Sequence, residues 1–272
     1  MEGNLIKMDS VTFTSNEFIE LKTLVYQICG INLHEGKLEL LKSKVAKRMR
    51  LTKMNIHEYL SHLKSNEREV IEFIDTVTTN HSFFFRENES IEYIVDHFNR
   101  NPQKAKKQFK IWCAACSTGD EPYTIAVQLE NLGLSYTILA TDISHSVLEV
   151  AARGIYKNDK IKNVPKPILH KFFQKGVGKY KDHIKIKKKI QQQITFKKFN
   201  LISDIMKQTD FDLVLCRNVM IYFDNQTSEK VVNKLYKSIS PNNFFAIGNA
   251  ESLMNMRHKF KPVKGMPSLY RK

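Results

Sequence analysis

Residues suited to binding a small molecule follow four apolar segments between residues 109 and 218, each where a predicted strand ends. They are Gly119 and Glu121, Asp142, Asn200, and Arg217 with Asn218. In open α/β sheets, ligands bind outside the carboxyl ends of the strands, where the connecting loops gather around one crevice. The spacing therefore predicts one ligand site that four loops assemble.

The loop that contains Gly119 has the clearest local pattern. Residues 110–114 form an apolar run of strand length, residues 117–119 favour a turn, and Pro122 is tolerated in the first turn of a following helix. Such a turn presents backbone N–H groups to a ligand, although an ordinary strand-to-helix connection has the same pattern.

Asp142 lies 23 residues after Gly119, at the end of the second predicted strand. In nucleotide-binding α/β folds, an acidic residue about 20 residues beyond the glycine turn accepts hydrogen bonds from ribose hydroxyls. The loop lacks the three-glycine fingerprint that accompanies a pyrophosphate, which argues against a dinucleotide. These residues by themselves leave both a dehydrogenase and a methyltransferase open.

An α/β sheet must position these loops, because strand and helix patterns alternate from residue 109 to the C-terminus. The predicted strands are 109–114, 136–142, 194–199, 211–216 and 244–248, with a helix at about 226–239 and a terminal hairpin at 260–272. A basic, mostly β insertion at about 157–192 interrupts the alternation. Within it, Ile184 and Ile186 alternate with lysines as in a half-exposed strand.

Residues 1–77 predict a small helical domain. Capping boxes begin helices after Thr14 and Asn55. Another helix, at about 37–50, has an apolar side and a basic side, as expected for a helix that packs in a small bundle.

Helical periodicity stops at residues 78–90, which contain three consecutive phenylalanines followed by Arg86. One interpretation is a linker that lines the ligand site, and the alternative is a buried hinge between two domains. Residues 91–272 then form the ligand-binding domain, including the insertion.

The composition predicts an acidic partner. The 272-residue chain has a formal net charge of +15 and a pI near 9.5, and 14 of its lysines lie between Lys157 and Lys198. A nucleic acid, an anionic membrane surface or an acidic protein would each complement this charge. A solvated surface explains the lysine-rich segment equally well.

No apolar run approaches the roughly 20 residues that a membrane span needs, and the first residues contain no signal-peptide core. A cytoplasmic protein without membrane insertion is therefore expected. Of the four cysteines, Cys113 and Cys116 have C-x-x-C spacing, but they lie in or beside a predicted buried strand. Buried thiols are predicted rather than a metal or redox site.

Several longer motifs resemble the CheR-type chemotaxis receptor methyltransferases. They are TTNHSFFFRE (78–87), WCAACSTGDEPYTIA (112–126), LATDIS (139–144), ARGIY (152–156), FNL (199–201), CRNVMIYFD (216–224) and AESL (250–253). Their order and spacing cover essentially the whole chain. The resemblance implies a class I S-adenosylmethionine-dependent methyltransferase, with a Rossmann-like α/β sheet, a small N-terminal all-helical domain and a small β insertion.

The resemblance also implies roles for individual residues, with S-adenosylhomocysteine as the product and no metal. Asn80, Ser82 and Arg86 would line the methionine end of the cofactor, and Gly119 would cradle it. Glu121 would bind the ammonium group and Asp142 the ribose hydroxyls. The adenine region would contact Asn200 and Leu201, and Arg217 and Asn218 would form the wall near the sulfonium.

The implied reaction is O-methylation of glutamate side chains in chemotaxis receptors. A glutamate with a pKa of about 4.3 is already ionised at neutral pH, so no catalytic base is needed. The enzyme must desolvate the carboxylate and aim it at the methyl group. Arg86 and Tyr222 are predicted to position that carboxylate.

The implied partner is the cytoplasmic helical bundle of a receptor, bound by a monomer. The basic residues predicted to meet it are Lys44, Lys47, Arg48 and Arg50. In some members of the family the β-subdomain binds a short peptide at the receptor's C-terminus. The turn at 181–183 departs from the glycine-containing turn of such members, so this contact stays open.

Two other functions compete with the receptor methyltransferase. A non-catalytic binding module would keep the fold without the reaction, but Arg86, Glu121 and Asp142 are all retained. A nucleic-acid methyltransferase would suit the positive charge, but the N/D-P-P-Y signature that holds a target base is absent. Asn249 and Ala250 replace a His and a Ser that are typical of the family, which puts in doubt any role assigned to those two positions.

Overall fold

The structure is a computed structural model that describes residues 14–33, 38–78, 80–100 and 108–272. The chain divides into two compact units, residues 1–78 and 79–272. Each unit has its own core, and each is described by itself below. No helix among the described residues has the length and apolar character required to span a membrane.

The first unit is helical. Its helices are α1 (Ser15–Cys29), α2 (Leu38–Thr52), α3 (Ile56–Ser65) and α4 (Glu67–Val77). Both predicted capping boxes are present, at Thr14 and Asn55, and Gly30 ends α1 in the left-handed conformation with φ of 72°. The start of the second helix was predicted at Lys37, which lies outside the described residues.

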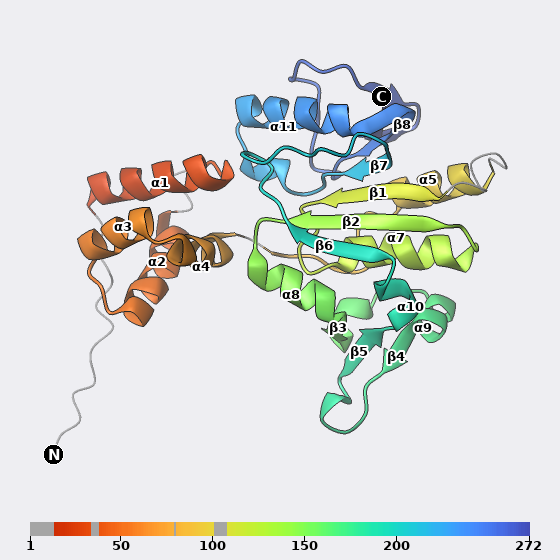
Figure 1. Cartoon of the computed structure of the whole chain (residues 1–272), viewed down its shortest axis with the longest axis horizontal. Helices are drawn as coiled ribbons and strands as arrows, with labels where there is room; N and C mark the ends of the chain where they lie inside the picture. Colours follow the sequence, from red (N-terminus) through yellow and green to blue (C-terminus); the bar gives the residue numbers. More distant parts are fainter. Residues whose placement is uncertain (1–13, 34–37, 79, 101–107) are drawn as a thin grey trace. The chain divides into compact units, whose positions relative to one another are not determined.

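The second unit is built on a seven-stranded sheet with the order β6-β2-β1-β7-β8-β10-β9 (Figure 1). The strands are β1 (Phe109–Ala114), β2 (Tyr136–Asp142), β6 (Ile194–Lys198), β7 (Phe211–Leu215), β8 (Ile239–Ala246), β9 (Lys261–Val263) and β10 (Met266–Arg271). The first five in spatial order are parallel, and β10 is antiparallel to both of its neighbours. The carboxyl ends of the parallel strands therefore all lie at the same end of the sheet.

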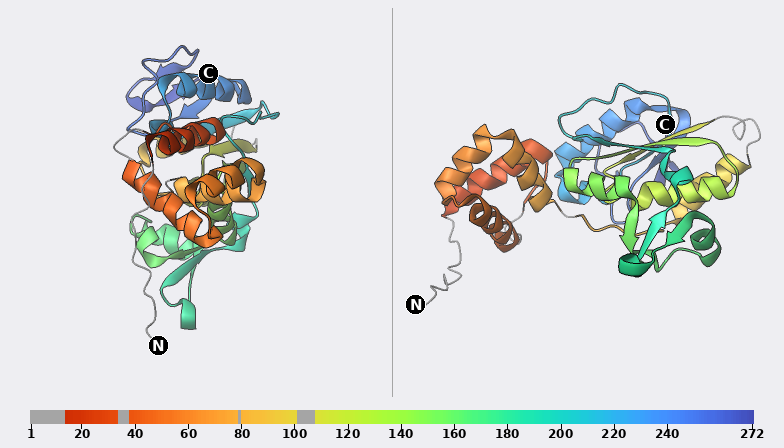
Figure 2. Two further views of the ribbon diagram at one scale, coloured as in Figure 1. Left: turned by 90° about the vertical axis from the view of Figure 1, so that its left-hand side faces the viewer. Right: turned by 60° about the horizontal axis from the view of Figure 1, so that its bottom comes forward.

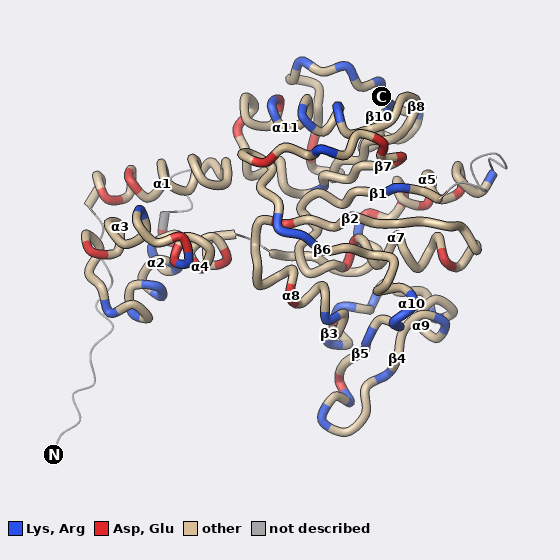
Figure 3. The backbone as a smooth tube through the Cα atoms, viewed as in Figure 1, with Lys and Arg blue, Asp and Glu red and all other residues tan. Residues whose placement is uncertain are grey.

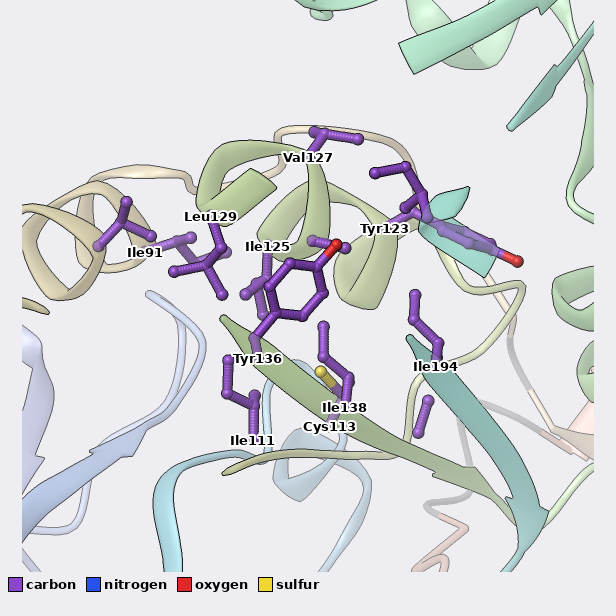
Figure 4. Close-up of a cluster of buried hydrophobic side chains, with 14 of the residues drawn as sticks. Ile91, Ile111, Cys113, Tyr123, Ile125, Val127, Leu129, Tyr136, Ile138 and Ile194 are labelled. Atoms are coloured by element: carbon purple, nitrogen blue, oxygen red, sulfur yellow. The ribbon is translucent and has the colours of Figure 1, made fainter. Parts of the chain in front are cut away.

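Helices cover both faces of this sheet (Figures 1 and 2). Side chains of β1 alternate between the two faces, as the two-residue period of a strand requires. Ile111 and Cys113 join the core beneath α5 (Glu89–Asn99) and α7 (Asp120–Asn131), which Figure 4 shows in part. Trp112 and Ala114 join the core beneath α11 (Asn225–Ser238). Because both faces are buried, β1 is apolar without interruption from Ile111 to Ala114.

The insertion follows α8 (His145–Arg153) and projects away from the sheet in all three views (Figures 1 and 2). Three short antiparallel strands form its sheet: β3 (Ile155–Lys157), β5 (His183–Ile186) and β4 (Phe173–Lys175). It contains more helix than the expected mostly β segment: η2 (Asn158–Ile161), α9 (Lys166–Phe172), η3 (Gly178–Tyr180) and α10 (Lys188–Gln191). In α9 the buried residues Ile168 and Phe172 have i, i+4 spacing, which is helical. Figure 3 shows its many basic residues.

The terminal hairpin is confirmed as β9 and β10, but the predicted boundary before it was wrong. The strand expected at 244–248 begins earlier, because Phe211 already pairs with Ile239. The register then shifts, and Phe244 is the partner of Leu213. Residues 240–243 thus bulge out of the ladder, which accommodates Pro241 where no N–H is needed.

Candidate functional site

The loop after β1 has an unusual backbone. Ala115, Ser117 and Gly119 have φ angles of 73°, 49° and 87°, all in the left-handed region. For the two residues with side chains this conformation is strained, and such strain is concentrated at functional sites. At Gly119 an added Cβ would lie 2.8 Å from the Cβ of Ala151, so the close packing of the loop requires glycine.

Asp142 anchors this loop to the end of β2. One carboxylate oxygen accepts a hydrogen bond from the N–H of Ser117 at 2.8 Å, and the other accepts one from the N–H of Ser144 at 3.0 Å. A carboxylate has about four acceptor sites, so a carboxylate at this position can accept from more than two donors. The hydroxyl oxygen of Ser117 is buried without a hydrogen-bond partner among the described residues.

Arg217 lies at the centre of an ion-pair network; its side chain is 3% exposed, and its two carboxylate partners, Glu121 and Glu87, are half-buried. Its Nη1 donates to Glu121 at 2.9 Å, and its Nη2 donates to the backbone carbonyl oxygens of Arg86 at 3.0 Å and Glu87 at 2.7 Å. Its Nε has no partner among the described residues. Burial raises the pKa of the Glu121 carboxyl, and the adjacent Arg217 guanidinium offsets this only in part.

Glu87 connects Arg217 to the neighbouring loops. Its carboxylate accepts hydrogen bonds from Asn218 Nδ2 at 3.1 Å and from the N–H of Asn249 at 2.8 Å. Burial acts to raise the pKa of Glu87, but these two donors and the nearby arginines lower it overall. Glu87 is therefore held as a carboxylate that joins three segments of the chain.

Glu251 holds the loop after β7 in place. Its carboxylate accepts hydrogen bonds from four backbone N–H groups: Gly248 at 2.6 Å, Asn218 at 3.0 Å, Val219 at 2.9 Å and Met220 at 2.8 Å. Asn218 itself adopts the left-handed region, with φ of 58°. This carboxylate thus fixes a strained loop that carries Arg217.

The structure joins Arg86, Glu121, Arg217 and Asn218 in one network through Glu87, since Arg86 Nε also lies 3.6 Å from Glu87. Arg86 additionally donates to the carbonyl oxygen of His81 at 3.0 Å. The other predicted cofactor residues precede Arg86 in the chain or lie at or after the carboxyl ends of the neighbouring parallel strands β1, β2 and β6. Asn80 and Ser82 precede Arg86, Gly119 and Asp142 form the first loop, and Asn200 and Leu201 follow β6.

Asn200 and Leu201 have local structural roles. Asn200 Oδ1 accepts a hydrogen bond from the N–H of Ile202 at 2.9 Å, and Leu201 is buried in the core beneath α11. Tyr222 is half-buried in the short helix η4 (Met220–Tyr222), directly after the loop that Glu251 holds. A cavity of about 480 Å³ is lined mainly by residues of β2 and β6 and by residues 205–208, and its lining contains none of the predicted site residues.

The basic residues predicted to bind the receptor lie in the first unit and differ in their environments. Arg48 pairs with Glu69 at 2.7 Å and Glu72 at 3.1 Å. Lys44 donates to the carbonyl oxygens at the end of α4. Lys47 and Arg50 are exposed. The charge of Arg48 is thus largely neutralised within its own unit.

Three residues of the site were not predicted from the sequence: Ser117, Glu87 and Glu251. All three lie inside the quoted motifs, but nothing in their local spacing shows which hydrogen-bond partners they would have. All four cysteines are buried free thiols, as predicted.

The donors and acceptors in this network fit S-adenosylmethionine. Glu121 offers a carboxylate to an ammonium group, and the unpartnered Nε of Arg217 and hydroxyl of Ser117 lie on the loops around it. When the strands of the main sheet are counted alone in chain order, their spatial order is 3-2-1-4-5-7-6, with the seventh reversed. In this sheet a glycine loop follows the first strand, and the acidic residue Asp142 ends the second. Together with the strand order, these features define an S-adenosylmethionine-dependent methyltransferase.

Two models of one protein family match this chain. The model for "CheR methyltransferase, SAM binding domain" matches residues 80–268, and that for "CheR methyltransferase, all-alpha domain" matches residues 16–78. The chain therefore belongs to the CheR methyltransferase family. The predicted fold class, enzyme class and cofactor are confirmed.

Curated relatives match over most of their length. The chain is 32% identical to chemotaxis protein methyltransferase 2 of Pseudomonas aeruginosa, over 92% of this chain and 91% of that protein. It is 32% identical to the chemotaxis protein methyltransferase of Borreliella burgdorferi, over 97% and 96%. For the Escherichia coli protein of the same name the identity is 30%, over 93% and 90%.

Proposed function

We propose that this protein methylates glutamate side chains in the cytoplasmic helical bundles of bacterial chemotaxis receptors. The observation that carries the proposal is the network that joins the buried Arg217 to the half-buried Glu121 and Glu87 beside the glycine loop, in a chain of the CheR family. Related proteins named chemotaxis protein methyltransferase support the same function. The protein would act in the cytoplasm, as a monomer, where these receptor bundles lie.

S-adenosylmethionine supplies an electrophilic methyl group when it is bound. In the proposed arrangement Glu121 pairs with its ammonium group, Asp142 accepts from its ribose hydroxyls, and Asn200 and Leu201 border the adenine. Asn80, Ser82, Gly119 and Asn218 complete the walls. The receptor carboxylate forms its new O–C bond as the C–S bond breaks, so no proton moves and no base is required.

The direct test is methyl transfer from labelled S-adenosylmethionine to receptor cytoplasmic fragments, with RNA as the competing substrate. A base-labile label on the receptor is expected, because a glutamate methyl ester hydrolyses in base. Calorimetric titration with S-adenosylmethionine addresses the non-catalytic alternative. Absence of cofactor binding would favour a binding module, and a label on RNA would overturn the proposed substrate.

Tyr222→Phe is expected to slow methyl transfer roughly tenfold, because one hydrogen bond that orients a charged carboxylate contributes about 1.5 kcal/mol. The affinity for S-adenosylmethionine should stay nearly unchanged. Single-turnover rates at saturating cofactor measure the first quantity, and calorimetry the second. Unchanged single-turnover rates would remove Tyr222 from the proposed site.

The double variant Lys47→Glu, Arg50→Glu is expected to lower the receptor kcat/KM roughly tenfold at low salt, since charges on an interface rim act mainly on association. The difference should shrink in about 0.15 M salt, where the Debye length is about 8 Å. These two exposed residues give a cleaner test than Arg48, because reversing Arg48 would also leave Glu69 without its partner. The matched control is the exposed Lys230→Glu in α11. If the double variant and the Lys230→Glu control had equal activity at every salt concentration, an electrostatic contact through Lys47 and Arg50 would be excluded.

A further inference from the structure

Lys160 connects the insertion to both sides of the proposed cofactor site. It lies in η2, at the start of the insertion, with its side chain 28% exposed. Its ammonium group donates to the carbonyl oxygen of Ser82 at 2.8 Å, to Thr118 Oγ1 at 3.0 Å and to the Asp120 carboxylate at 3.3 Å. An ammonium group has three N–H donors, so these three partners use its full capacity.

The three partners belong to two segments of the proposed site, the wall segment before Arg86 and the glycine loop with the start of α7. Ser82 lies in the segment that precedes Arg86, Thr118 lies beside Gly119, and Asp120 is the first residue of α7. None of them is near Lys160 in sequence; the separations are 78, 42 and 40 residues. One side chain of the insertion therefore fixes the spacing between the glycine loop and the opposite wall.

Asp120 gives this contact an electrostatic component. Its side chain is fully buried, and it accepts a hydrogen bond from Thr118 Oγ1 at 2.5 Å in addition to the ion pair with Lys160. A carboxylate in the first turn of a helix is stabilised by the helix dipole, but only by about 0.3–1 kcal/mol. The fully buried Asp120 therefore also needs the charge of Lys160. The contacts with Ser82 and Thr118 are not explained in this way, because both acceptors are uncharged groups outside α7.

A second contact from the insertion reinforces the first. The hydroxyl of Tyr156, in β3, donates to the carbonyl oxygen of Thr118 at 2.7 Å. The same hydroxyl lies 3.1 Å from the position that a Cβ on Gly119 would occupy. The backbone and the side chain of Thr118 are thus both held by residues of the insertion.

We propose that Lys160 is a positioning residue for cofactor binding, which holds the glycine loop and the wall segment at the separation that S-adenosylmethionine requires. The inference rests on the proposed placement of the cofactor between these two segments. It assigns the lysine-rich insertion a role in the cofactor site that is independent of any protein partner. Lys160 acts through Ser82, Thr118 and Asp120 and does not itself touch the reacting atoms.

The test uses the full chain with Lys160→Met and, as matched control, the exposed neighbour Lys162→Met. Lys160→Met is expected to raise the Kd for S-adenosylmethionine about tenfold, since three hydrogen bonds to a charged donor order the loops. The KM for the cofactor should rise in parallel, whereas kcat at saturating cofactor and the KM for receptor fragments should stay within about twofold. The control should bind like the wild type.

The double variant Lys160→Met, Asp120→Asn separates positioning from charge neutralisation. If Lys160 only neutralised Asp120, removing both charges would restore the wild-type Kd, and that result would overturn the proposal. A Kd that stays raised in the double variant supports it. The double variant also remains informative if Lys160→Met fails to fold, because it leaves no unpaired buried carboxylate. Binding is measured by calorimetry without receptor, so wild-type protein that binds cofactor but leaves receptors unmethylated would refute only the proposed substrate.

Discussion

Replacing Glu251 by alanine is expected to reduce methyl transfer by roughly two orders of magnitude, although Glu251 is not proposed to touch the cofactor or the substrate. Its carboxylate accepts hydrogen bonds from four backbone N–H groups, and three of these groups belong to residues 218–220. Hydrogen bonds to a charged group contribute about 1.5–3 kcal/mol each, so losing even two costs about 3 kcal/mol, which corresponds to a hundredfold.

The loss acts through the loop that follows β7. Asn218 holds a left-handed backbone conformation there, and the preceding residue is Arg217. Without the carboxylate, the strained conformation loses the acceptor that compensates it. Arg217 and Asn218 would then leave their positions beside Glu87, so both cofactor affinity and the single-turnover rate should fall.

Glu251→Gln provides the graded comparison. Its amide keeps one oxygen, which can still accept from Val219 and Met220, but its NH2 group would face the N–H groups of Gly248 and Asn218. An intermediate rate is therefore expected. Met254→Ala, at a side chain that is 89% exposed, controls for changes in the same segment. Equal rates for wild type and Glu251→Ala would show that the loop holds its geometry without this carboxylate.

The sequence patterns were sufficient for the parallel sheet and for the two helix starts with capping boxes, because these depend on local signals. Burial of a strand is predicted from the apolar residues in 109–114 themselves. A helix start is predicted from hydrogen bonds between residues three positions apart, as at Thr14 and Asn55. The position of Asp142 at the end of β2 followed from the same local logic. Strand ends could therefore be placed, and with them the polar residues that surround the glycine loop.

Contacts between distant segments could not be predicted in this way. Glu87 meets Asn218 across 131 residues, and the carboxylate of Glu251 meets a loop 31 to 33 residues away. The basic face of α2 gives a second example. Counting charges on one helix could not show that Glu69, 21 residues beyond Arg48, would neutralise it. The helical content of the insertion was underestimated because its lysines obscured the spacing of Ile168 and Phe172.

Arg217→Met is expected to cost about 3–5 kcal/mol in the free energy of unfolding at neutral pH, because breaking a buried ion pair leaves uncompensated charge. The guanidinium is 3% exposed and pairs with both Glu121 and Glu87. Chemical denaturation measures this loss. The matched control is the exposed Arg257→Met. Arg217→Lys should lie between the two, since it keeps a charge but cannot reach several acceptors at once.

The pH dependence of the same variant provides the sharper result. Burial already raises the pKa of Glu121, and Arg217 is the neighbour that opposes the rise, so its removal should raise that pKa further. A proton on Glu121 removes a buried charge, and the stability lost in Arg217→Met should therefore be partly recovered as the pH is lowered.

Binding of S-adenosylmethionine should change in the opposite direction, because the cofactor's ammonium group needs the ionised carboxylate. The affinity for the cofactor is expected to fall as the pH drops through the pKa of Glu121. This fall should occur at a higher pH in Arg217→Met than in the wild type. If the stability loss and the cofactor affinity of Arg217→Met were both independent of pH, Glu121 would not be the ammonium-binding group.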